Sequence, residues 1–192
     1  MKQYYNLPAS LPYIDYDTES FLSPAEFCEQ CEPWLTPSDL TVIQGLAKEG
    51  GLADFLDHLE RVLPEYASYE RGLRTALAQT RAQKLQRDYF APSGVSTGGE
   101  IERDTVEAFA QPDALQREMV LDRRRWAKLD ELAVGHIFDI IFLVVYGLKL
   151  RLLQRKTSFT RQKGSENFSA SYTSVWSGIQ NHVPKTETGA NT

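Results

Sequence analysis

The uncharged run from Ile140 to Leu148 restricts the fold of this chain more than any other feature of its sequence. As a helix it would cover only about 13 Å, because each residue adds about 1.5 Å, whereas the core of a bilayer requires about 20 apolar residues. The charged residues that follow directly would lie in hydrocarbon if the helix were extended to span a membrane. They are Lys149, Arg151, Arg155 and Lys156. We therefore expect a helix over about 137–156 that is buried on most sides of a water-soluble bundle.

Two capping signals predict where earlier helices begin. In Ser23–Glu26 (SPAE) and Thr36–Asp39 (TPSD), the first residue suits the N-cap, proline suits the first helical position and an acidic residue stands at the third. Gly50–Gly51 and Pro64 mark breaks in the apolar periodicity that follows. We expect helices over about 24–31, 37–48, 52–63 and 65–87.

The rest of the chain contains fewer capping signals. Pro8 and Pro12 exclude a long helix over residues 4–21, which we expect to be an extended segment on the surface of the bundle. Residues 91–99 (APSGVSTGG) are the best candidate for a hinge loop between two helical halves. After this loop we expect one helix over about 101–110 and another from Pro112, at its first position, to Val134, where Gly135 ends it.

These elements predict an all-α fold, a helical bundle with an extended N-terminal segment. The bundle would form one domain over residues 1–160. Residues 161–180 form a marginal amphipathic segment whose pattern fits a helix and also alternates like a strand. Residues 181–192 have almost nothing to bury, so we expect a disordered tail.

Charge and cysteine content exclude some functions. The net charge is −5, which argues against a nucleic-acid partner. Residues 1–60 hold eleven acidic side chains against Lys2 and Lys48, whereas the remainder is basic, so the chain can orient on a charge-asymmetric partner. Cys28 and Cys31 form a single C-x-x-C inside a helical pattern, and we expect structural thiols in a reducing cytoplasm. The N-terminus lacks the pattern of a signal peptide, which also indicates a cytoplasmic location.

An acidic residue lies on the apolar stripe of the 112–134 helix. Asp122 shares this stripe with Trp126 and with other apolar residues. A buried unpaired carboxylate costs several kcal/mol, so Asp122 needs a partner if it is buried. The candidates are Arg125, Arg123 or a basic group of the 65–87 helix.

Basic side chains line one face of the 65–87 helix. Three interpretations stay open: the face binds nucleic acid, it contacts an acidic protein partner, or it pairs internally with acids such as Asp122 and Asp130. No groove-reading motif accompanies the face, which favours the last two. Its members are Arg71, Arg74 and Arg81, with Lys84 and Arg87 nearby.

One group of residues has the composition of a metal site. His136 is flanked by Asp130, Glu131 and Asp139, but Gly135 breaks the helix between them and the spacing matches no helical metal motif. The alternative is that Asp130 and Glu131 pair with basic residues of 123–128 and that His136 contacts Asp139. No glycine pattern for nucleotide binding is present either. We therefore expect no catalytic residue, metal or cofactor, and keep a metal-dependent helical enzyme as a minor alternative.

Four segments of the chain together resemble an uncharacterised bacterial family: residues 4–14, 22–43, 69–88 and 123–159. The genes of this family lie beside those of V-type (A/V-type) ATPases. The family is similar to the C-type subunit of V-type ATPases, which is called the d-type subunit in eukaryotes. The most specific matching pieces are Tyr69-Glu70 with Leu73-Arg74, the run Arg81–Leu85, Arg125-Trp126 with Leu129–Leu132, His136 with Phe138-Asp139, and Tyr146 with Leu148–Leu150 and Arg155.

The resemblance implies a non-catalytic rotor connector, a helical subunit that joins the central shaft to the proteolipid ring and supports ion transport. Its partners would be the central-shaft subunits and the proteolipid ring, at the cytoplasmic surface of the inner membrane, with contact to the membrane only through the complex. An adaptor or assembly factor for the same complex is the alternative. The chain departs from the C-type pattern in being short, with a Ser/Thr-rich C-terminus in place of further helices.

Charged and aromatic residues of the matched segments and of the helix stripes are the candidates for structural or partner contacts. They are Glu70, Arg71, Arg74, Arg81, Lys84, Asp122, Arg125, Trp126, Asp130, Glu131, His136, Asp139, Tyr146, Lys149 and Arg155.

Overall fold

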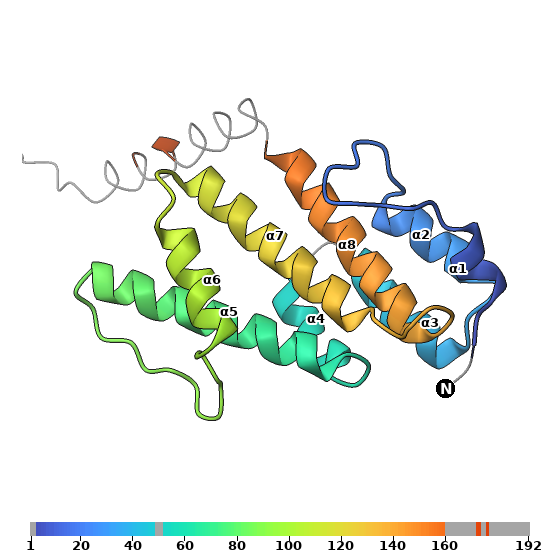
Figure 1. Cartoon of the computed structure of the whole chain (residues 1–192), viewed down its shortest axis with the longest axis horizontal. Helices are drawn as coiled ribbons and strands as arrows, with labels where there is room; N and C mark the ends of the chain where they lie inside the picture. The colour runs from blue at the N-terminus through green and yellow to red at the C-terminus, as the bar shows by residue number, and fades with distance from the viewer. Residues whose placement is uncertain (1–2, 49–51, 160–171, 174–175, 177–192) are drawn as a thin grey trace, which may run out of the picture. The chain divides into compact units, whose positions relative to one another are not determined.

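The structure, a computed structural model, describes residues 3–48, 52–159, 172–173 and 176. These residues form helices, turns and loops, and none of them lies in a strand, which confirms the predicted all-α fold. The chain divides into a compact unit of Met1–Lys156 and a second unit of Thr157–Thr192. The first unit contains α1 to α7 and most of α8 (Figure 1).

All seven predicted helices are present, most of them with shifted ends. The helix α2 has the predicted bounds, and α5 starts at its proline instead of one residue later. The bounds are α1 Asn6–Ser10, α2 Pro24–Cys31, α3 Pro37–Ala47, α4 Leu52–Leu59, α5 Pro64–Lys84, α6 Glu100–Phe109, α7 Ala114–Leu132 and α8 Ile140–Ser158.

The two capping signals behave differently. Ser23 and Glu26 form the full reciprocal box: the Ser23 hydroxyl accepts from the Glu26 amide at 3.2 Å, and the Glu26 carboxylate accepts from the Ser23 amide at 2.8 Å. At α3 only half of the box forms, because Thr36 accepts from the Asp39 amide while the Asp39 carboxylate accepts from the Tyr4 hydroxyl. The second signal therefore starts a helix and also ties it to the N-terminal segment.

Two helix starts were predicted wrongly, and aspartate caps explain both. Pro112 does not open α7, because Asp113 is its N-cap and accepts from the Gln116 amide at 2.7 Å. The helix α8 begins at Ile140 instead of Ile137, and the Asp139 carboxylate accepts from the amide of Phe142 at 3.1 Å. In both places an aspartate that can bind free amides sets the first turn.

The N-terminal segment is more deeply integrated than predicted. It contains the short helix α1, and its side chains Tyr4, Leu7, Ile14 and Tyr16 are buried in the core instead of lying on the surface of the bundle. The Tyr16 ring packs edge-on against Trp126 of α7, with centroids 5.7 Å apart. Burial of these side chains holds the segment in place, although its prolines prevent a long helix.

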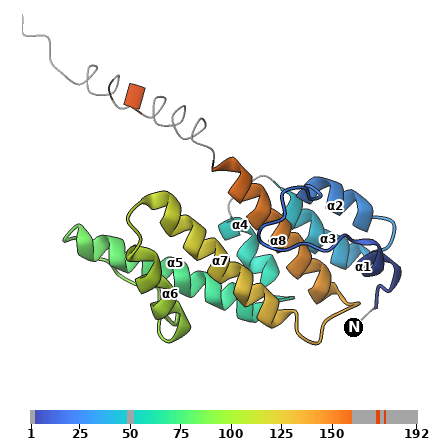
Figure 2. The same ribbon diagram turned by 45° about the horizontal axis from the view of Figure 1, so that its top comes forward.

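The uncharged run of α8 lies at the centre of the first unit. In Figures 1 and 2, α8 runs beside α7 on one side and α2 and α3 on the other. Gly147 makes this packing close: a Cβ there would lie 2.7 Å from Leu46 Cδ1 and 3.1 Å from Phe27 Cε1. Among the described residues, no helix has both the length and the apolar character that crossing a bilayer requires. The prediction that this run belongs to a bundle core is confirmed.

The described residues of the second unit after α8 are Phe159, Tyr172, Thr173 and Trp176, and the last three are helical. The Tyr172 and Trp176 rings stack, with centroids 6.3 Å apart and planes 8° apart, as residues one helical turn apart can. The remainder of the predicted amphipathic segment 161–180 and the predicted tail 181–192 lie outside the described residues.

Candidate functional site: a buried ion network and a polar pocket

Charged side chains form a continuous ion network that joins α5, α7 and α8. Arg125 of α7 is its centre: Nε donates to Glu70 Oε2 at 2.9 Å, and Nη1 donates to Asp122 Oδ1 at 3.0 Å. The Glu70, Asp122 and Arg125 side chains are only 1%, 0% and 8% exposed. In order, the network runs through Arg74, Glu70, Arg125, Asp122, Arg155 and Glu118.

Both carboxylate oxygens of Glu70 accept hydrogen bonds. Oε1 accepts from Arg74 Nε at 2.9 Å and from Arg125 Nη2 at 3.3 Å, while Oε2 accepts from Arg125 Nε. Burial raises the pKa of Glu70, but attraction to Arg125 and the hydrogen bonds from Arg125 and Arg74 outweigh it, so the pKa lies below its ordinary value. The network therefore stabilises Glu70 in its ionised form.

Asp122 is less completely satisfied. Its Oδ1 accepts from Arg125 and, at 2.7 Å, from Arg155 of α8. Its Oδ2 is buried and has no hydrogen-bond partner among the described residues. Burial raises the pKa of Asp122, and the attraction of Arg155 and Arg125 offsets only part of this effect. The two buried carboxylates of one network thus have opposite pKa shifts.

The geometry decides between the partners predicted for Asp122. The pairing with Arg125 is confirmed. Arg123 instead lies over the Tyr16 ring, with Cζ 5.4 Å from its centroid. The basic candidate from α5, Arg74, pairs with Glu70 and reaches Asp122 only through Arg125.

Two further contacts of the network were not predicted. Arg155 of α8 pairs with Asp122 and also donates to Glu118 of α7 at 2.5 Å. The available signal was spacing, because Glu118, Asp122 and Arg125 stand four and three residues apart and share one face of a helix. That spacing predicts a charged face but does not say that α8 covers it.

The predicted basic face of α5 divides into two parts. Arg71 pairs with Asp57 and Glu60, both at 2.8 Å, and Arg74 pairs with Glu70. Arg81, one turn beyond the buried part, has no ion pair in the described part of the chain. Lys84 likewise lacks an acidic partner there, and its Nζ lies 4.5 Å from the centroid of the Phe109 ring. Internal pairing therefore accounts for the first part of this face only.

The four residues of the candidate metal site make separate contacts. Glu131 pairs with Lys128 of its own helix, as predicted, whereas Asp130 pairs with Lys149 of α8 instead of with a basic residue of 123–128. His136 Nδ1 lies 2.6 Å from Asp139 Oδ2, as the ion-pair interpretation predicted. Within residues 3–48 and 52–159, no three metal-ligating side chains are grouped as a cation would require.

Three candidate residues pack at the joint between α7, α8 and the N-terminal segment. Lys149 Nζ lies 5.1 Å from the Trp126 ring, which is buried. The Tyr146 hydroxyl donates to the Pro12 carbonyl at 2.9 Å, and burial raises the pKa of Tyr146 to about 12. The Tyr146 hydrogen bond anchors the N-terminal segment to α8, and the Lys149 contact joins α8 to α7.

The cysteines of α2 are free thiols, and Cys31 is buried. Burial raises the pKa of the Cys31 thiol to about 12, and it raises the pKa of Cys28 as well. A thiol of high pKa is a poor nucleophile and metal ligand, which agrees with the structural role predicted for this pair.

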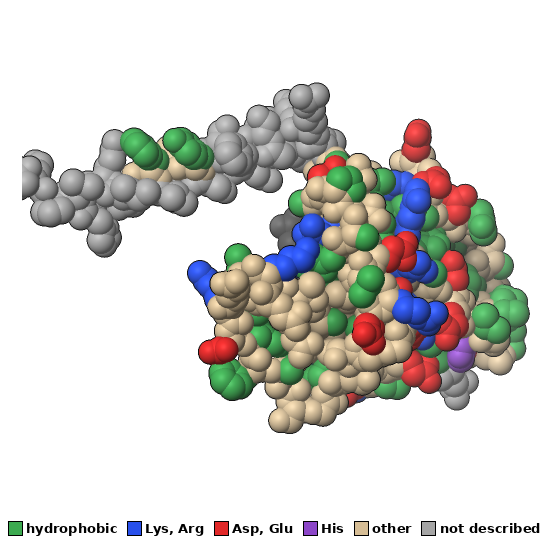
Figure 3. Space-filling view, turned by 60° about the vertical axis from the view of Figure 1, so that its left-hand side comes forward, with side chains coloured by type: hydrophobic (Ala, Val, Ile, Leu, Met, Phe, Trp, Pro, Cys, Tyr) green, Lys and Arg blue, Asp and Glu red, His purple; other side chains and the backbone are tan. Residues whose placement is uncertain are grey.

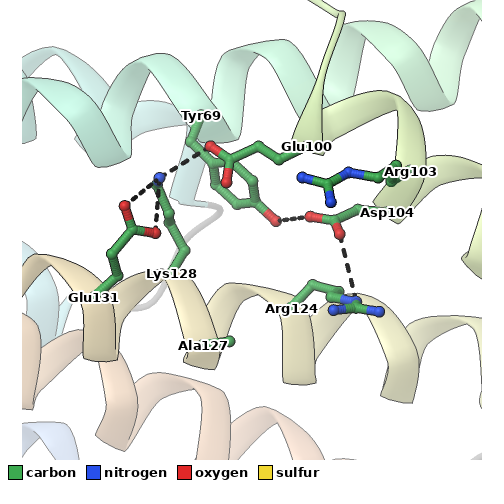
Figure 4. A pocket seen from close by; sticks show the side chains of 8 residues that line it. All are labelled: Tyr69, Glu100, Arg103, Asp104, Arg124, Ala127, Lys128 and Glu131. Carbon is green, nitrogen blue, oxygen red and sulfur yellow. Dashed lines mark hydrogen bonds and ion pairs between the residues drawn. The ribbon is translucent and has the colours of Figure 1, made fainter.

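A polar pocket of about 190 Å³ opens between α5, α6 and α7 (Figure 4). Asp104 of α6 stands at its centre, where it accepts from the Tyr69 hydroxyl at 2.7 Å and lies 3.4 Å from Arg124 Nε. Lys128 pairs with Glu100 at 2.9 Å across the pocket. The lining residues are Tyr69, Glu100, Arg103, Asp104, Arg124, Ala127, Lys128 and Glu131.

The pocket is built mainly from ion pairs between helices. Burial raises the pKa of Tyr69, and its hydrogen bond to Asp104 raises it further, so the phenol remains a donor. The eight lining residues, all in the described part of the chain, include no Ser, Thr, Cys or His. Of these residues only Glu131 was predicted as a candidate, because the spacing within one helix does not show which acids of α6 face which bases of α7.

Residues 99–171 match a family model described as "Protein of unknown function (DUF2764)". The matched segment is less than half of the chain and contains α6, α7 and α8. It therefore includes the α7 and α8 members of the ion network and most of the pocket, but not Glu70 or Tyr69 of α5. No curated protein and no solved structure matches the chain.

Proposed function

We propose that the protein is a non-catalytic connecting subunit of a bacterial V-type ATPase or ATP synthase. It would join the central shaft to the proteolipid ring at the cytoplasmic surface of the inner membrane and support ion transport. The main support is that the ion network and the resemblance involve the same residues. The segments that most specifically resemble the family encoded beside V-type ATPase genes contain four members of the buried ion network: Glu70, Arg74, Arg125 and Arg155.

The mechanics of the network fit this role. A connector that transmits torque has to keep its helices in fixed register under load, and directional contacts between helices resist sliding and rotation better than apolar packing alone. Arg125 ties α7 to α5, and Asp122 ties α7 to α8 through Arg155. A sliding motion of any of these helices would separate buried opposite charges, which is costly at low dielectric.

The experiment is to purify the V-type ATPase from its native cells through a tag on one of its catalytic polypeptides. Mass spectrometry then measures the amount of this chain relative to the shaft subunits. We expect one fixed ratio in the finished enzyme. Absence of the chain from every ATPase fraction would overturn the proposal, and presence only in incomplete complexes would replace it with the assembly-factor alternative.

A deletion of the chain gives the second readout. We expect the remaining enzyme to hydrolyse ATP without coupled ion transport, because the catalytic subunits would be intact and the shaft would not drive the ring. Restoring the wild-type chain should restore coupling. Full coupling in the deletion strain would contradict the proposed role.

A further inference from the structure

The C-terminal end of α5 and the residues after it form an exposed surface that combines basic and apolar side chains. Figures 1 and 2 both show this end of α5 at the outer edge of the first unit. Phe90 is 91% exposed, Leu85 is 64% exposed and Tyr89 is 38% exposed, so three large apolar side chains are exposed within one stretch of six residues. This surface, the α5 tip, consists of Arg81, Lys84, Leu85, Arg87, Tyr89 and Phe90.

The basic side chains of the α5 tip have no ion pair in the described part of the chain. These side chains are Arg81, Lys84 and Arg87, and all three are exposed. Asp88 is the acidic residue within the segment, so the tip is positive although the whole chain has a net charge of −5.

A fourth cation joins the tip from another helix. Two of the cations lie near the Phe109 ring of α6, with Lys84 Nζ 4.5 Å and Arg117 Cζ 4.6 Å from its centroid. Arg117 belongs to α7, and its Nε is buried without a hydrogen-bond partner among the described residues. Figure 3 shows basic, acidic and hydrophobic side chains along the left-hand edge of the compact unit.

We propose that the α5 tip binds directly to the headgroup layer of an anionic phospholipid bilayer. The four cations would lie against lipid phosphates, and Tyr89 and Phe90 would enter the interface between headgroups and acyl chains. This inference goes beyond the proposed function, which places the chain near a membrane only through its partners.

The shape of the tip favours a lipid surface over an acidic protein. Phe90 projects into solvent from irregular backbone beyond the helix, so a protein partner would need a pocket of matching shape for the Phe90 ring. A bilayer interface accepts a projecting aromatic ring without a preformed pocket. The phosphates of mobile lipids can also move to match the positions of the basic side chains.

The test is sedimentation of the full chain with vesicles at low salt. One set contains phosphatidylcholine alone and the other contains phosphatidylcholine mixed with phosphatidylglycerol. We expect binding to the mixed vesicles only, and loss of that binding at high salt because exposed charges are screened. Equal binding to both sets, or no binding to the mixed set as expected for a tip that serves an acidic protein, would overturn the proposal.

Matched charge variants locate the surface. Lys84→Gln with Arg87→Gln should weaken binding about 25-fold, since each basic side chain near an anionic surface contributes about fivefold. Lys48→Gln with Arg61→Gln removes the same charge from exposed positions elsewhere and should change binding less than about twofold. Equal effects of the two double variants would show that net charge, not the tip, governs binding.

A Phe90→Trp variant tests the depth of insertion. Brominated acyl chains should quench its fluorescence more than they quench the wild-type chain, whose tip has no tryptophan. Thermal unfolding of every variant should match the wild type because the altered side chains are exposed. Equal quenching of wild type and variant would contradict insertion of the tip.

Discussion

The buried part of α5 and its exposed end carry similar residues in opposite surroundings. Between Tyr66 and Leu77 the apolar side chains are buried and the charged ones are paired. From Arg81 onward the basic side chains have no ion pair among the residues described, and the apolar ones project outward. The buried part of α5 is therefore a fixed structural element, whereas the last turn of α5 and the residues after it form an exposed surface.

The difference follows from what lies opposite each half. Arg125 of α7 faces Glu70, and Asp57 and Glu60 face Arg71, so charges in the first half find partners within the chain. The second half faces Phe109, whose ring attracts cations without neutralising them. Charged side chains that are paired within the chain hold the helices in place. The unpaired basic side chains at the exposed end are available to a binding partner.

The largest expected effect is that of Arg125→Met. This variant keeps the bulk of the side chain but leaves two buried carboxylates without their shared cation, so the free energy of unfolding should fall by about 3–5 kcal/mol. Urea unfolding followed by circular dichroism measures the loss. The matched control Arg81→Met, at the exposed end, should stay within about 0.5 kcal/mol of wild type. Similar losses for both variants would remove the distinction between the two ends.

Gly72→Ala should have the next largest effect. A Cβ at this position would lie 2.4 Å from the Ser96 carbonyl oxygen and 2.5 Å from Ile101 Cδ1, so loop 91–99 packs directly on the buried part of α5. The overlap costs about 1–3 kcal/mol, and the better helix propensity of alanine returns at most about 1 kcal/mol. The control Gly98→Ala has no neighbour within 4 Å and should not destabilise. A more stable Gly72→Ala would mean that the loop moves away freely, as the predicted hinge requires.

Glu70→Gln and Asp122→Asn should change the pH dependence of stability in opposite directions. The pKa of Glu70 is lowered from 4.5 in the folded chain. The ionised Glu70 carboxylate therefore contributes its full stabilisation of the fold above pH 4.5, and this stabilisation is lost as the pH falls through the pKa of the folded chain. The pKa of Asp122 is raised from 3.8, so its ionisation lowers stability as the pH rises from 3.8 through the folded value.

Unfolding of both variants at neutral and acidic pH provides the measurement. Relative to wild type, Glu70→Gln should become less destabilising as the pH falls, whereas Asp122→Asn should become more destabilising or lose a stabilising effect. Parallel pH profiles for the two variants would contradict the assignment of one satisfied and one incompletely satisfied carboxylate.

The smallest expected effect is that of Asp130→Ala. The Asp130 side chain is 57% exposed, so its ion pair with Lys149 is a surface pair worth about 0.2–1 kcal/mol. Thermal unfolding should show a small shift that salt reduces. A loss as large as that of Arg125→Met would show that the exposed pair matters as much as the buried network.

Local signals predicted much of the fold. The start of α2 follows from the Ser23–Glu26 box, and the central position of α8 follows from a run too short to span a bilayer. The starts of α7 and α8 were predicted wrongly because Asp113 and Asp139 bind the free amides of the first turn. Sequence alone does not show which of several possible residues at a helix start makes these hydrogen bonds.

The candidate site was only partly predictable. The pair of Asp122 with Arg125 lies within one helix, so its spacing is visible in the sequence. The contact between Glu70 and Arg125 joins residues 55 positions apart, and no periodicity fixes such a pairing. Sequence periodicity likewise places Arg71, Arg74 and Arg81 on one face of a helix. Whether each of them is paired depends on which other helices lie opposite, and the sequence does not show this.

Hydrogen–deuterium exchange of the full chain, read by mass spectrometry, tests the division of α5 most directly. Amides over residues 66–77 should exchange far more slowly than those over 81–90, and Arg125→Met should speed exchange in the first stretch while leaving the second unchanged. Equal exchange rates along both stretches, or an Arg125→Met effect of the same size in each, would contradict the account.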